Sequence, residues 1–439
     1  MQVSYVIGAS QDCPCQVYTE FDVDHLDVAR FQQAVQHVVD RHPMLHAVIV
    51  DGTQQRIRTA SERRPPLHLI VDQTPDLDAR RRACMTAFKA RPELHWDLQL
   101  SALSATTVRL HLVLDMLFID ATSAMQLCHE VSEHYRRLVG QGTVTAPVDG
   151  AFAFRDYCDQ LDTKQASAAS LEYWTARCAT IPGPPQLPCL KKTGGQDVDF
   201  QRESITLGAE HWTTLKGCAG ELKVTPNAIL LAAFSEVLRL YGEEPDFSVT
   251  VTMSERPVSR GRDFTGVVGE FTNILLCPVH GGHGDSLAER ARAIHHELSE
   301  GLEYSDVSGL EVTRMLRKHR ADPHLAFPIV FTSFLGIVRS DLELAGCQTR
   351  LHYQQTQTPQ VTLDHQVYEL NGELQSNWDY DATIFGPELI RDMLSCFRSL
   401  LERVAADNLR AATLPPEVLH LRRGMNRTDR TFDADAPRL

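Results

Sequence analysis

The hydrophobic positions along the first half of the chain follow two periods, that of a strand and that of a helix. An extended run at residues 15–22 is followed by apolar positions at helical spacing over residues 26–39. Residues 108–115 alternate between apolar and polar as a strand, and residues 124–138 have helical spacing, with Ser123 as the expected N-cap. This alternation of strand and helix predicts a mixed α/β fold.

The second half of the chain repeats the alternation. Thr225 and Pro226 are the N-cap and first residue expected of an apolar helix that continues through Leu240. The last two predicted strands are joined by Asn371-Gly372, a strong signal for a tight hairpin turn. Strands are predicted at residues 247–253, 327–332, 361–369 and 373–380.

A Pro- and Gly-rich segment at residues 181–196 separates these two parts and is the best linker in the chain. The chain has 439 residues, of which 43% are hydrophobic and 23% charged, as in an ordinary globular protein. This length is sufficient for two domains of normal size. We therefore predict an N-terminal α/β domain at residues 1–185 and a C-terminal α/β domain at residues 186–439.

Charge and cysteine content exclude several function classes. Asp and Glu number 57 against 43 Lys and Arg, and the net charge of −14 repels phosphate backbones, so nucleic acid is not an expected partner. The apolar runs are far shorter than the ~20 residues that cross a bilayer, so no membrane association is expected. The 11 cysteines include no pair of CxxC units, which favours reduced cytoplasmic thiols over a zinc site.

The sharpest local motif is D-M-L-F-I-D-A-T-S, from Asp115 to Ser123. A predicted strand ends in the first carboxylate, and Asp120 and Ser123 open the helix that follows. Two carboxylates at such a turn fit either of two roles. They can form a general acid–base pair, or they can provide a helix N-cap and an ion pair that holds the loop. The acid–base role is the less favoured of the two.

This motif is similar to the D-x-x-x-x-D-x-x-S signature of the heterocyclization domains of nonribosomal peptide synthetases, which are relatives of the condensation domains. Condensation domains carry H-H-x-x-x-D-G at this place, and the aligned pair here is Asp115 and Met116. Because a thioether has no proton to transfer, condensation-type histidine chemistry is excluded at this position. Further segments resemble family motifs in the same order: QVSYVIG (2–8), RHPML (41–45) with GTQ (52–54), LPCL (187–190), TPNAILLAAFSEVL (225–238), EFT (270–272), FPIVFTS (327–333), TPQVTLDHQ (358–366) and GELQSNWD (372–379).

The resemblance implies an α/β fold of two chloramphenicol-acetyltransferase-like lobes, set as a V-shaped pseudo-dimer with a central tunnel. The phosphopantetheine arms of an upstream and a downstream peptidyl carrier protein would enter this tunnel. An adenylation domain would be adjacent, so the chain is expected to be a monomeric domain of a larger synthetase or a freestanding form of one. No bound cofactor and no metal are expected, since the acyl thioester supplies the driving force.

The resemblance also implies a reaction in three steps. The amine of a carrier-bound Cys, Ser or Thr attacks the upstream acyl thioester and forms an amide. The side-chain thiol or hydroxyl then attacks the new amide carbonyl. Loss of water leaves a thiazoline or oxazoline, a product expected in siderophore or antibiotic biosynthesis.

The resemblance assigns Asp364 as the catalytic carboxyl of the last two steps and Thr332 as its partner hydroxyl. Ser333 and Gln366 are supporting candidates for the same hydrogen-bond network. A carboxyl whose pKa is shifted by a buried site can take a proton from the nucleophile and give one to the departing oxygen. The residue types alone favour structural groups at strand ends, so these roles rest on the resemblance.

Glu255 is a departure from the family pattern. Family members often have Asn in an F-N-R segment, and alignment on Arg256 places Glu255 at that position. An amide both donates and accepts hydrogen bonds, whereas an ionised carboxylate only accepts. Three functions therefore stay open. They are heterocyclization, which we favour, a condensation reaction that stops at the amide, and a non-catalytic module that docks carrier proteins.

Overall fold

The computed structural model describes residues 14–50, 54–63, 67–73, 75–86, 88, 94–140, 152–163, 165–190, 198–259, 262–281, 286–337 and 342–406. The chain forms two compact units, each assembled from three segments. Unit 1 consists of Met1–Thr163, Ser254–Thr272 and Ile337–Pro359, and unit 2 of Lys164–Met253, Asn273–Gly336 and Gln360–Leu439. This division differs from the two continuous domains predicted at 1–185 and 186–439, because two segments of the second half belong to unit 1.

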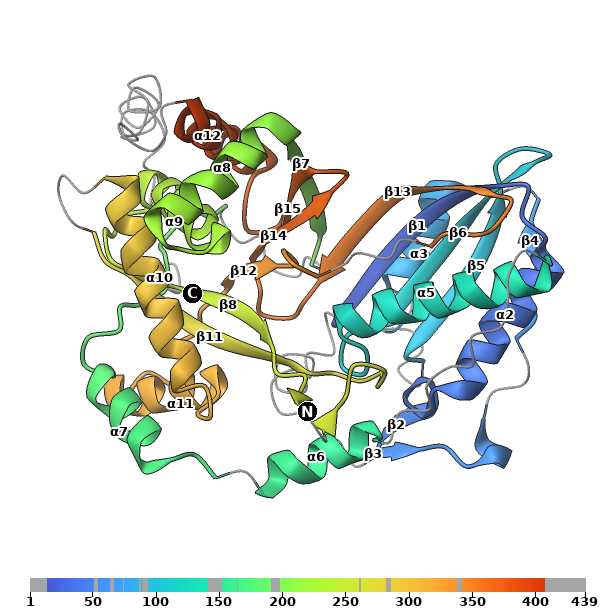
Figure 1. Ribbon diagram of the computed structural model, residues 1–439, viewed down its shortest axis with the longest axis horizontal. Helices are drawn as coiled ribbons and strands as arrows, with labels where there is room; N and C mark the ends of the chain where they lie inside the picture. Colours follow the sequence, from blue (N-terminus) through green and yellow to red (C-terminus); the bar gives the residue numbers. More distant parts are fainter. Residues whose placement is uncertain are drawn as a thin grey trace. The chain divides into compact units, whose positions relative to one another are not determined.

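Unit 1 is built on a five-stranded sheet with the strand order β13-β1-β6-β5-β4 (Figure 1). The strands of this sheet are β1 (Gln16–Asp24), β4 (Val71–Asp72), β5 (Trp96–Ala102), β6 (Thr107–Asp115) and β13 (Gln348–Gln357). The helices are α2 (Val28–Arg41), η1 (Pro43–His46), η2 (Ala60–Glu62), α3 (Leu77–Met85), α5 (Ala121–Leu138) and α6 (Phe154–Thr163). Two small hairpins complete the unit: β2 (Ala47–Val50) with β3 (Gln54–Ile57), and β9 (Val258–Ser259) with β10 (Arg262–Asp263).

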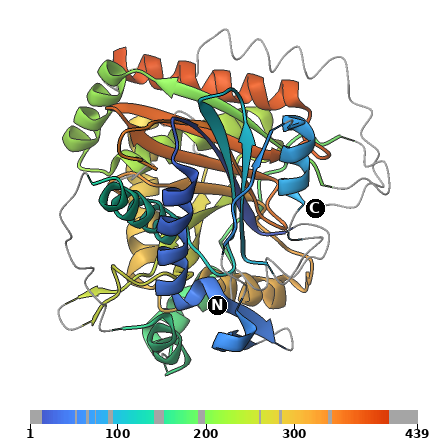
Figure 2. The same cartoon turned by 90° about the vertical axis from the view of Figure 1, so that its right-hand side faces the viewer.

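The sheet of unit 1 buries apolar side chains on both faces because successive residues of a strand point to opposite sides. Phe21 and Val23 of β1 pack with helices α2 and α5, whereas Tyr18 of the same strand packs with Cys84 of α3. In Figure 2, α2 and α5 accordingly lie on one side of the strands and α3 on the other. Strand β1 pairs antiparallel with both β6 and β13, so a strand from the second half of the chain completes this sheet.

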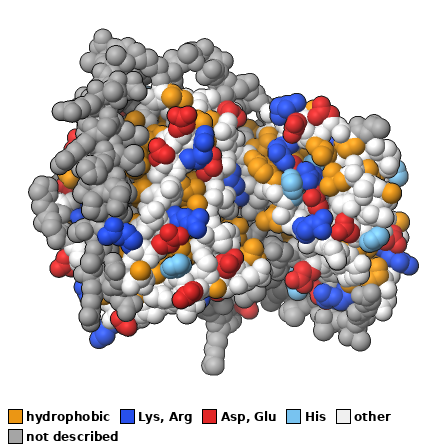
Figure 3. Space-filling model, turned by 90° about the horizontal axis from the view of Figure 1, so that it is seen from above, with side chains coloured by type: hydrophobic (Ala, Val, Ile, Leu, Met, Phe, Trp, Pro, Cys, Tyr) orange, Lys and Arg blue, Asp and Glu red, His pale blue; other side chains and the backbone are white. Residues whose placement is uncertain are grey.

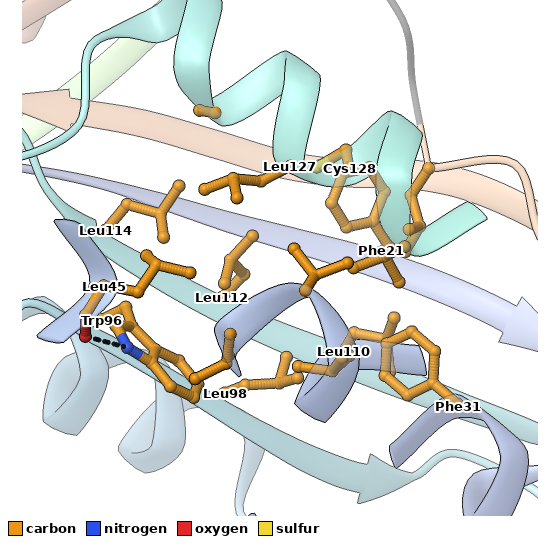
Figure 4. A pocket seen from close by; sticks show the side chains of 16 residues that line it. Phe21, Phe31, Leu45, Trp96, Leu98, Leu110, Leu112, Leu114, Leu127 and Cys128 are labelled. Carbon is orange, nitrogen blue, oxygen red and sulfur yellow. Dashed lines mark hydrogen bonds between the residues drawn. The ribbon is translucent and has the colours of Figure 1, made fainter. Parts of the chain in front are cut away.

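The core between the sheet and helices α2 and α5 contains an apolar cavity of about 70 Å³. Figure 4 shows Phe31, Leu110, Leu112 and Leu127 among the side chains that line it. The indole Nε1 of Trp96, also in the lining, donates a hydrogen bond to the backbone oxygen of Leu45 (3.3 Å). With that donor satisfied, the cavity offers a water molecule no polar partner, so we expect it to be dry.

Unit 2 is built on a six-stranded sheet with the strand order β11-β8-β12-β14-β15-β7. Its strands are β7 (Phe200–Leu207), β8 (Phe247–Ser254), β11 (Thr272–Val279), β12 (Ile329–Ser333), β14 (Leu363–Leu370) and β15 (Glu373–Asp381). Its helices are α7 (Ala168–Arg177), α8 (Ala209–Leu222), α9 (Pro226–Tyr241), α10 (Leu287–Glu303), α11 (Gly309–Arg320) and α12 (Pro387–Ala406). Strand β12 runs parallel to β8 and β14, and β15 runs antiparallel to β14 and β7.

One face of the unit 2 sheet carries the main core of the unit. Helices α8, α9, α10 and α12 bury their apolar side chains there against residues such as Phe331, Val367 and Trp378. Helix α9 is buried around its whole circumference, which explains the nearly unbroken apolar sequence of residues 228–234. A smaller apolar cluster joins α7 and α11 to β11.

The local signals of unit 2 predict its elements well. The side chain of Thr225 accepts a hydrogen bond from the backbone N–H of Ala228 and caps α9, with Pro226 at its first position. Asn371 and Gly372 join β14 to β15 with positive φ angles of 53° and 79°, as a tight hairpin turn of this type requires. These two predictions are confirmed.

The start of α5 corrects the predicted N-cap. The helix begins at Ala121 rather than at residue 124, and the cap is Asp120, whose carboxylate accepts from the backbone N–H of Ser123 (2.7 Å). Some predictions lie outside the described residues. They are the motif matches at 2–8 and 52–53 and the linker beyond residue 190.

None of the described helices is both long and apolar enough to cross a membrane. On the face drawn in Figure 3, acidic and basic side chains are interspersed.

Candidate active site

A row of polar side chains lies on the face of the unit 2 sheet opposite the main core. Leu363, His365 and Val367 of β14 point toward the helices, so the alternate residues Asp364 and Gln366 project from the other face. Thr332 of the neighbouring strand β12 stands opposite Gln366 in the parallel register. The pleat of two adjacent strands therefore brings these three polar side chains together.

Asp364 accepts hydrogen bonds from both of its polar neighbours on this face. The hydroxyl of Thr332 donates to Oδ1 (2.9 Å), and the amide Nε2 of Gln366 donates to Oδ2 (2.7 Å). Burial is the largest influence on the carboxyl and, together with the negative charge of Asp379, it raises the pKa of Asp364 to about 6. The side chain keeps partial exposure. A half-buried carboxyl that titrates near neutral pH can exchange protons in both directions.

Ser333 is not part of this network, although the sequence made it a supporting candidate. It follows Thr332 in β12 and so points to the opposite face of the sheet. Its hydroxyl donates to Asn227 Oδ1 (2.7 Å) at the start of α9 and accepts from the backbone N–H of Leu335 (3.2 Å). Ser333 therefore joins the end of β12 to helix α9.

His365, the neighbour of Asp364, is also excluded from the polar face. Its ring is fully buried among aromatic side chains, including Phe234 and Trp378, and its Nε2 lies 2.9 Å from the hydroxyl of Ser376. Burial holds the pKa of His365 well below its ordinary value. We conclude that this imidazole is a neutral core group.

Sequence reasoning missed two charged residues in the row, Arg202 of β7 and Asp379 of β15. They form an ion pair beside Gln366, with both charged groups withdrawn from water. Asp379 carried a signal because it lies in the family-like segment GELQSNWD. Arg202 carried no signal, because the sequence of a single edge strand does not indicate which side chain its guanidinium will contact.

In unit 1, Asp115 and Asp120 of the D-x-x-x-x-D-x-x-S motif have separate surroundings. Asp115 Oδ1 accepts from the backbone N–H of Leu117 (2.9 Å), and Oδ2 lies 3.5 Å from Nδ1 of His95. Burial raises the pKa of Asp115. Its hydrogen bond within the turn indicates that Asp115 shapes the loop after β6.

Asp120 and Ser123 form a compact centre with Arg256. The guanidinium Nη2 lies 3.1 and 3.2 Å from the two oxygens of Asp120 and donates to the hydroxyl of Ser123 (2.9 Å). The same hydroxyl donates to the backbone oxygen of Gly269 (3.0 Å) and accepts from its N–H (3.1 Å). Asp120 thus caps the helix and forms the ion pair that holds the loop.

Gly269 fits this centre because it has no side chain. A Cβ at this position would clash with the ring of Phe154. The backbone oxygen of Gly269 also accepts from the N–H of Asp120 (3.0 Å). The close approach of these segments explains why glycine precedes the E-F-T segment.

Glu255 and Glu270 lie near this centre. The hydroxyl of Tyr157 donates to Glu255 Oε2 (3.3 Å), so Glu255 acts as an acceptor here. Glu270 is buried, and burial together with the charge of Asp120 raises the pKa of Glu270 to about 7. Glu255 belongs to unit 1, whereas Asp364 and Thr332 belong to unit 2.

Among the described residues, no group of three His, Cys, Asp or Glu side chains is placed to hold a metal ion. The polar row of unit 2 instead offers a proton-exchanging carboxyl, a hydroxyl and an amide. Such groups serve proton transfer and the orientation of a carbonyl or amide substrate.

Comparison with known proteins shows which family the chain resembles. The family model of the condensation domain matches residues 6–413. Pyochelin synthetase PchF of Pseudomonas aeruginosa is 30% identical over 92% of this chain, and phenyloxazoline synthase MbtB of Mycobacterium tuberculosis is 30% identical over 89%. The chain spans about a quarter of the length of these curated relatives, 23% of the first and 28% of the second.

Solved structures give the same result for the fold. The cyclization-docking bidomain of the nonribosomal peptide synthetase EpoB from Sorangium cellulosum superposes with a TM-score of 0.78 at 28% identity, over 92% of this chain and 84% of that one. The X-domain from teicoplanin biosynthesis has a TM-score of 0.74 at 17% identity, over 93% and 94% of the two chains, and shares the fold.

Proposed function

Since the chain belongs to the condensation-domain family, we propose that it acts as a heterocyclization domain of a nonribosomal peptide synthetase. Its substrates are an acyl or peptidyl thioester and a Cys, Ser or Thr residue, both carried on phosphopantetheine arms. The partners are the upstream and downstream peptidyl carrier proteins, with an adenylation domain adjacent. The observation that carries the proposal is the Asp364 carboxyl, which accepts from Thr332 and has a pKa raised to about 6.

The first step forms the amide. The amine nitrogen of the acceptor attacks the thioester carbonyl, a C–N bond forms, the C–S bond breaks, and the donor arm leaves as a thiol. The D-x-x-x-x-D motif itself contains no histidine, since Asp115 and Met116 stand where condensation domains carry their histidine pair. Positioning of the two arms supplies most of the catalysis in this step, because a thioester is already an activated acyl group.

The second and third steps are the work of Asp364. Its carboxylate takes the proton of the side-chain thiol or hydroxyl as that atom attacks the new amide carbonyl. The resulting carboxylic acid returns that proton to the alkoxide formed from the carbonyl oxygen, which becomes a hydroxyl. The carboxylate then takes the nitrogen proton and passes it to this hydroxyl, which leaves as water as the C=N bond forms. The hydroxyl of Thr332, 2.9 Å from Oδ1, holds the carboxyl in one orientation for both transfers.

Glu255 motivates the second candidate function, condensation without cyclization. The Tyr157 hydroxyl donates to this carboxylate, whereas an amide at this position could also donate a hydrogen bond to substrate. A non-catalytic docking module is the third outcome that the same experiment resolves.

Mass spectrometry of the carrier-bound product tests the proposal. We expect a product that has lost one water beyond the condensation product. A condensed product without that loss would establish condensation alone, and absence of acyl transfer would establish a docking module.

Two variants of β14 locate the activity. We expect Asp364→Ala to fold and to abolish dehydration, because it removes the carboxyl to which both proton transfers are assigned. The matched control is Glu369→Ala, which removes a carboxylate of the same strand whose partners are Trp212 and Lys216 on the helix side. Full cyclization by Asp364→Ala would refute the assignment.

A further inference from the structure

The Arg202–Asp379 ion pair lies in the same polar row as Thr332, on the two strands beyond β14. The guanidinium Nε and Nη2 of Arg202 each donate to one oxygen of Asp379, both at 2.6 Å. The side chain of Arg202 is 9% exposed and that of Asp379 is fully buried. Two-point pairing of this kind fixes both groups, since neither can turn without leaving a charge unpaired away from water.

Gln366 links this ion pair to the candidate catalytic carboxyl. Its Oε1 accepts from Nη2 of Arg202 (3.1 Å), and its Nε2 donates to Oδ2 of Asp364 (2.7 Å) and to Oδ2 of Asp379 (3.2 Å). A reversed amide would place its NH₂ group against the guanidinium and its oxygen between two carboxylates. The ion pair therefore determines which way the amide points.

We propose that Arg202 and Asp379 are positioning residues that act through Gln366 to orient the Asp364 carboxyl and to set its charge state. The effect of these residues on catalysis rests on the proposed function. Their effect on the orientation and charge of the Asp364 carboxyl does not depend on it. Neither Arg202 nor Asp379 is required to touch a substrate.

The charges that face Asp364 act in opposite directions. The negative charge of Asp379 raises the pKa of Asp364, whereas the hydrogen bond from Gln366 and the positive charge of Arg202 lower it. Thr332 also lowers it by donating to the carboxylate. The balance leaves the carboxyl half-ionised near pH 6, and removal of either kind of influence shifts this pH of half-ionisation in a predictable direction.

Two single variants test the proposal because they have opposite expected signs. Asp379→Asn removes the neighbouring negative charge and leaves that of Arg202, so the pH at which Asp364 titrates should fall by about one unit or more. Gln366→Leu removes the hydrogen bond that stabilises the carboxylate, so the same pH should rise. The matched control is Glu369→Gln, which removes a negative charge from the other face of β14 and should change nothing.

The titration of Asp364 is read in two ways. The first is the pH dependence of kcat for the dehydration step. The second needs no turnover: each variant is compared with its Asp364→Asn counterpart, and the difference in free energy of unfolding is followed from pH 5 to pH 8. If the pH dependence of unfolding shifts as expected but neither the wild type nor any variant cyclizes, the proposed function is wrong and the positioning role stands.

Three results would overturn the positioning role. They are shifts of the same sign in both single variants, no shift in either, or an equal shift in the control. If Asp379→Asn fails to fold, the double variant with Arg202→Met removes both charges of the ion pair, so neither is left without the other. Gln366 then loses its fixed orientation, so we expect kcat to fall at least tenfold with KM unchanged. A double variant with wild-type kcat and pH profile would also refute the proposal.

Discussion

The substitution Asp364→Asn tests the electrostatics of the candidate site without any substrate. Asparagine has nearly the same shape, and it can accept from Gln366 with its carbonyl and donate to the hydroxyl of Thr332, which is free to rotate. The site thus keeps its hydrogen bonds and loses only its ionisable group. Any change in pH-dependent stability then reports on the carboxyl.

The magnitude follows from the pKa of Asp364, which burial raises from 3.8 to about 6. Because the folded state holds the proton more tightly than the unfolded state, the ionised carboxyl destabilises the folded protein above pH 6. This penalty disappears as the pH falls through 6 toward 4. At 1.36 kcal/mol per unit the ceiling is about 3 kcal/mol, and about half of it falls between pH 5 and pH 8. Partial exposure of the side chain to water lowers the measured value.

Urea denaturation of the wild type and Asp364→Asn from pH 5 to pH 8 measures this effect. The variant should gain stability relative to the wild type as the pH rises, by about 1–1.5 kcal/mol over the range. A difference that does not change with pH, or one that changes in the opposite direction, would refute the elevated pKa and with it the role of Asp364 in proton transfer.

Other predictions concern unit 1. Asp120→Ala removes the cap of α5 and leaves Arg256 without its carboxylate, so we expect a loss of about 3–5 kcal/mol in the free energy of unfolding. Asp120→Asn, which retains the cap, should lose less, and equal losses would contradict the ion pair. Gly269→Ala should destabilise by about 1–3 kcal/mol because its Cβ meets an aromatic ring, whereas Gly266→Ala, where a Cβ meets nothing within 4 Å, should be nearly neutral. Equal melting temperatures for these two variants would count against the close packing. Val131→Ile extends a side chain into the apolar cavity and should raise the free energy of unfolding by about 1 kcal/mol; a decrease would mean that the cavity cannot take a methylene.

The sequence by itself determined the features that depend on a few adjacent residues. Thr225-Pro226 specifies the start of α9 because a side-chain acceptor and a fixed φ act within one turn. Asn371-Gly372 specifies the hairpin because few residues tolerate positive φ. The alternation of side chains along a strand also allowed a prediction about Ser333. Neighbouring residues of a strand face opposite sides of the sheet, so Thr332 and Ser333 could not both hydrogen-bond to Asp364.

Family resemblance located Asp364 and Thr332, but the sequence could not supply their surroundings. The pKa of Asp364 depends on how deeply the strand is packed and on the charges opposite it. Asp379 faces Asp364 through the antiparallel pairing of β14 and β15, which the hairpin signal does imply. The Asp379 side chain could therefore be placed beside Asp364, although nothing indicated that it would pair with Arg202.

Only the tertiary structure decided which distant segments meet. Strand β13 joins β1 in the sheet of unit 1 although the two come from opposite ends of the chain, which is why a single cut does not divide the units. Arg202 pairs with a carboxylate 177 residues away. Such pairings arise for two reasons. A strand lowers the free energy when it completes a sheet, and a buried charge lowers it when it meets an opposite charge. Both contributions depend on which segments pack together in the folded chain, so no short stretch of sequence determines them.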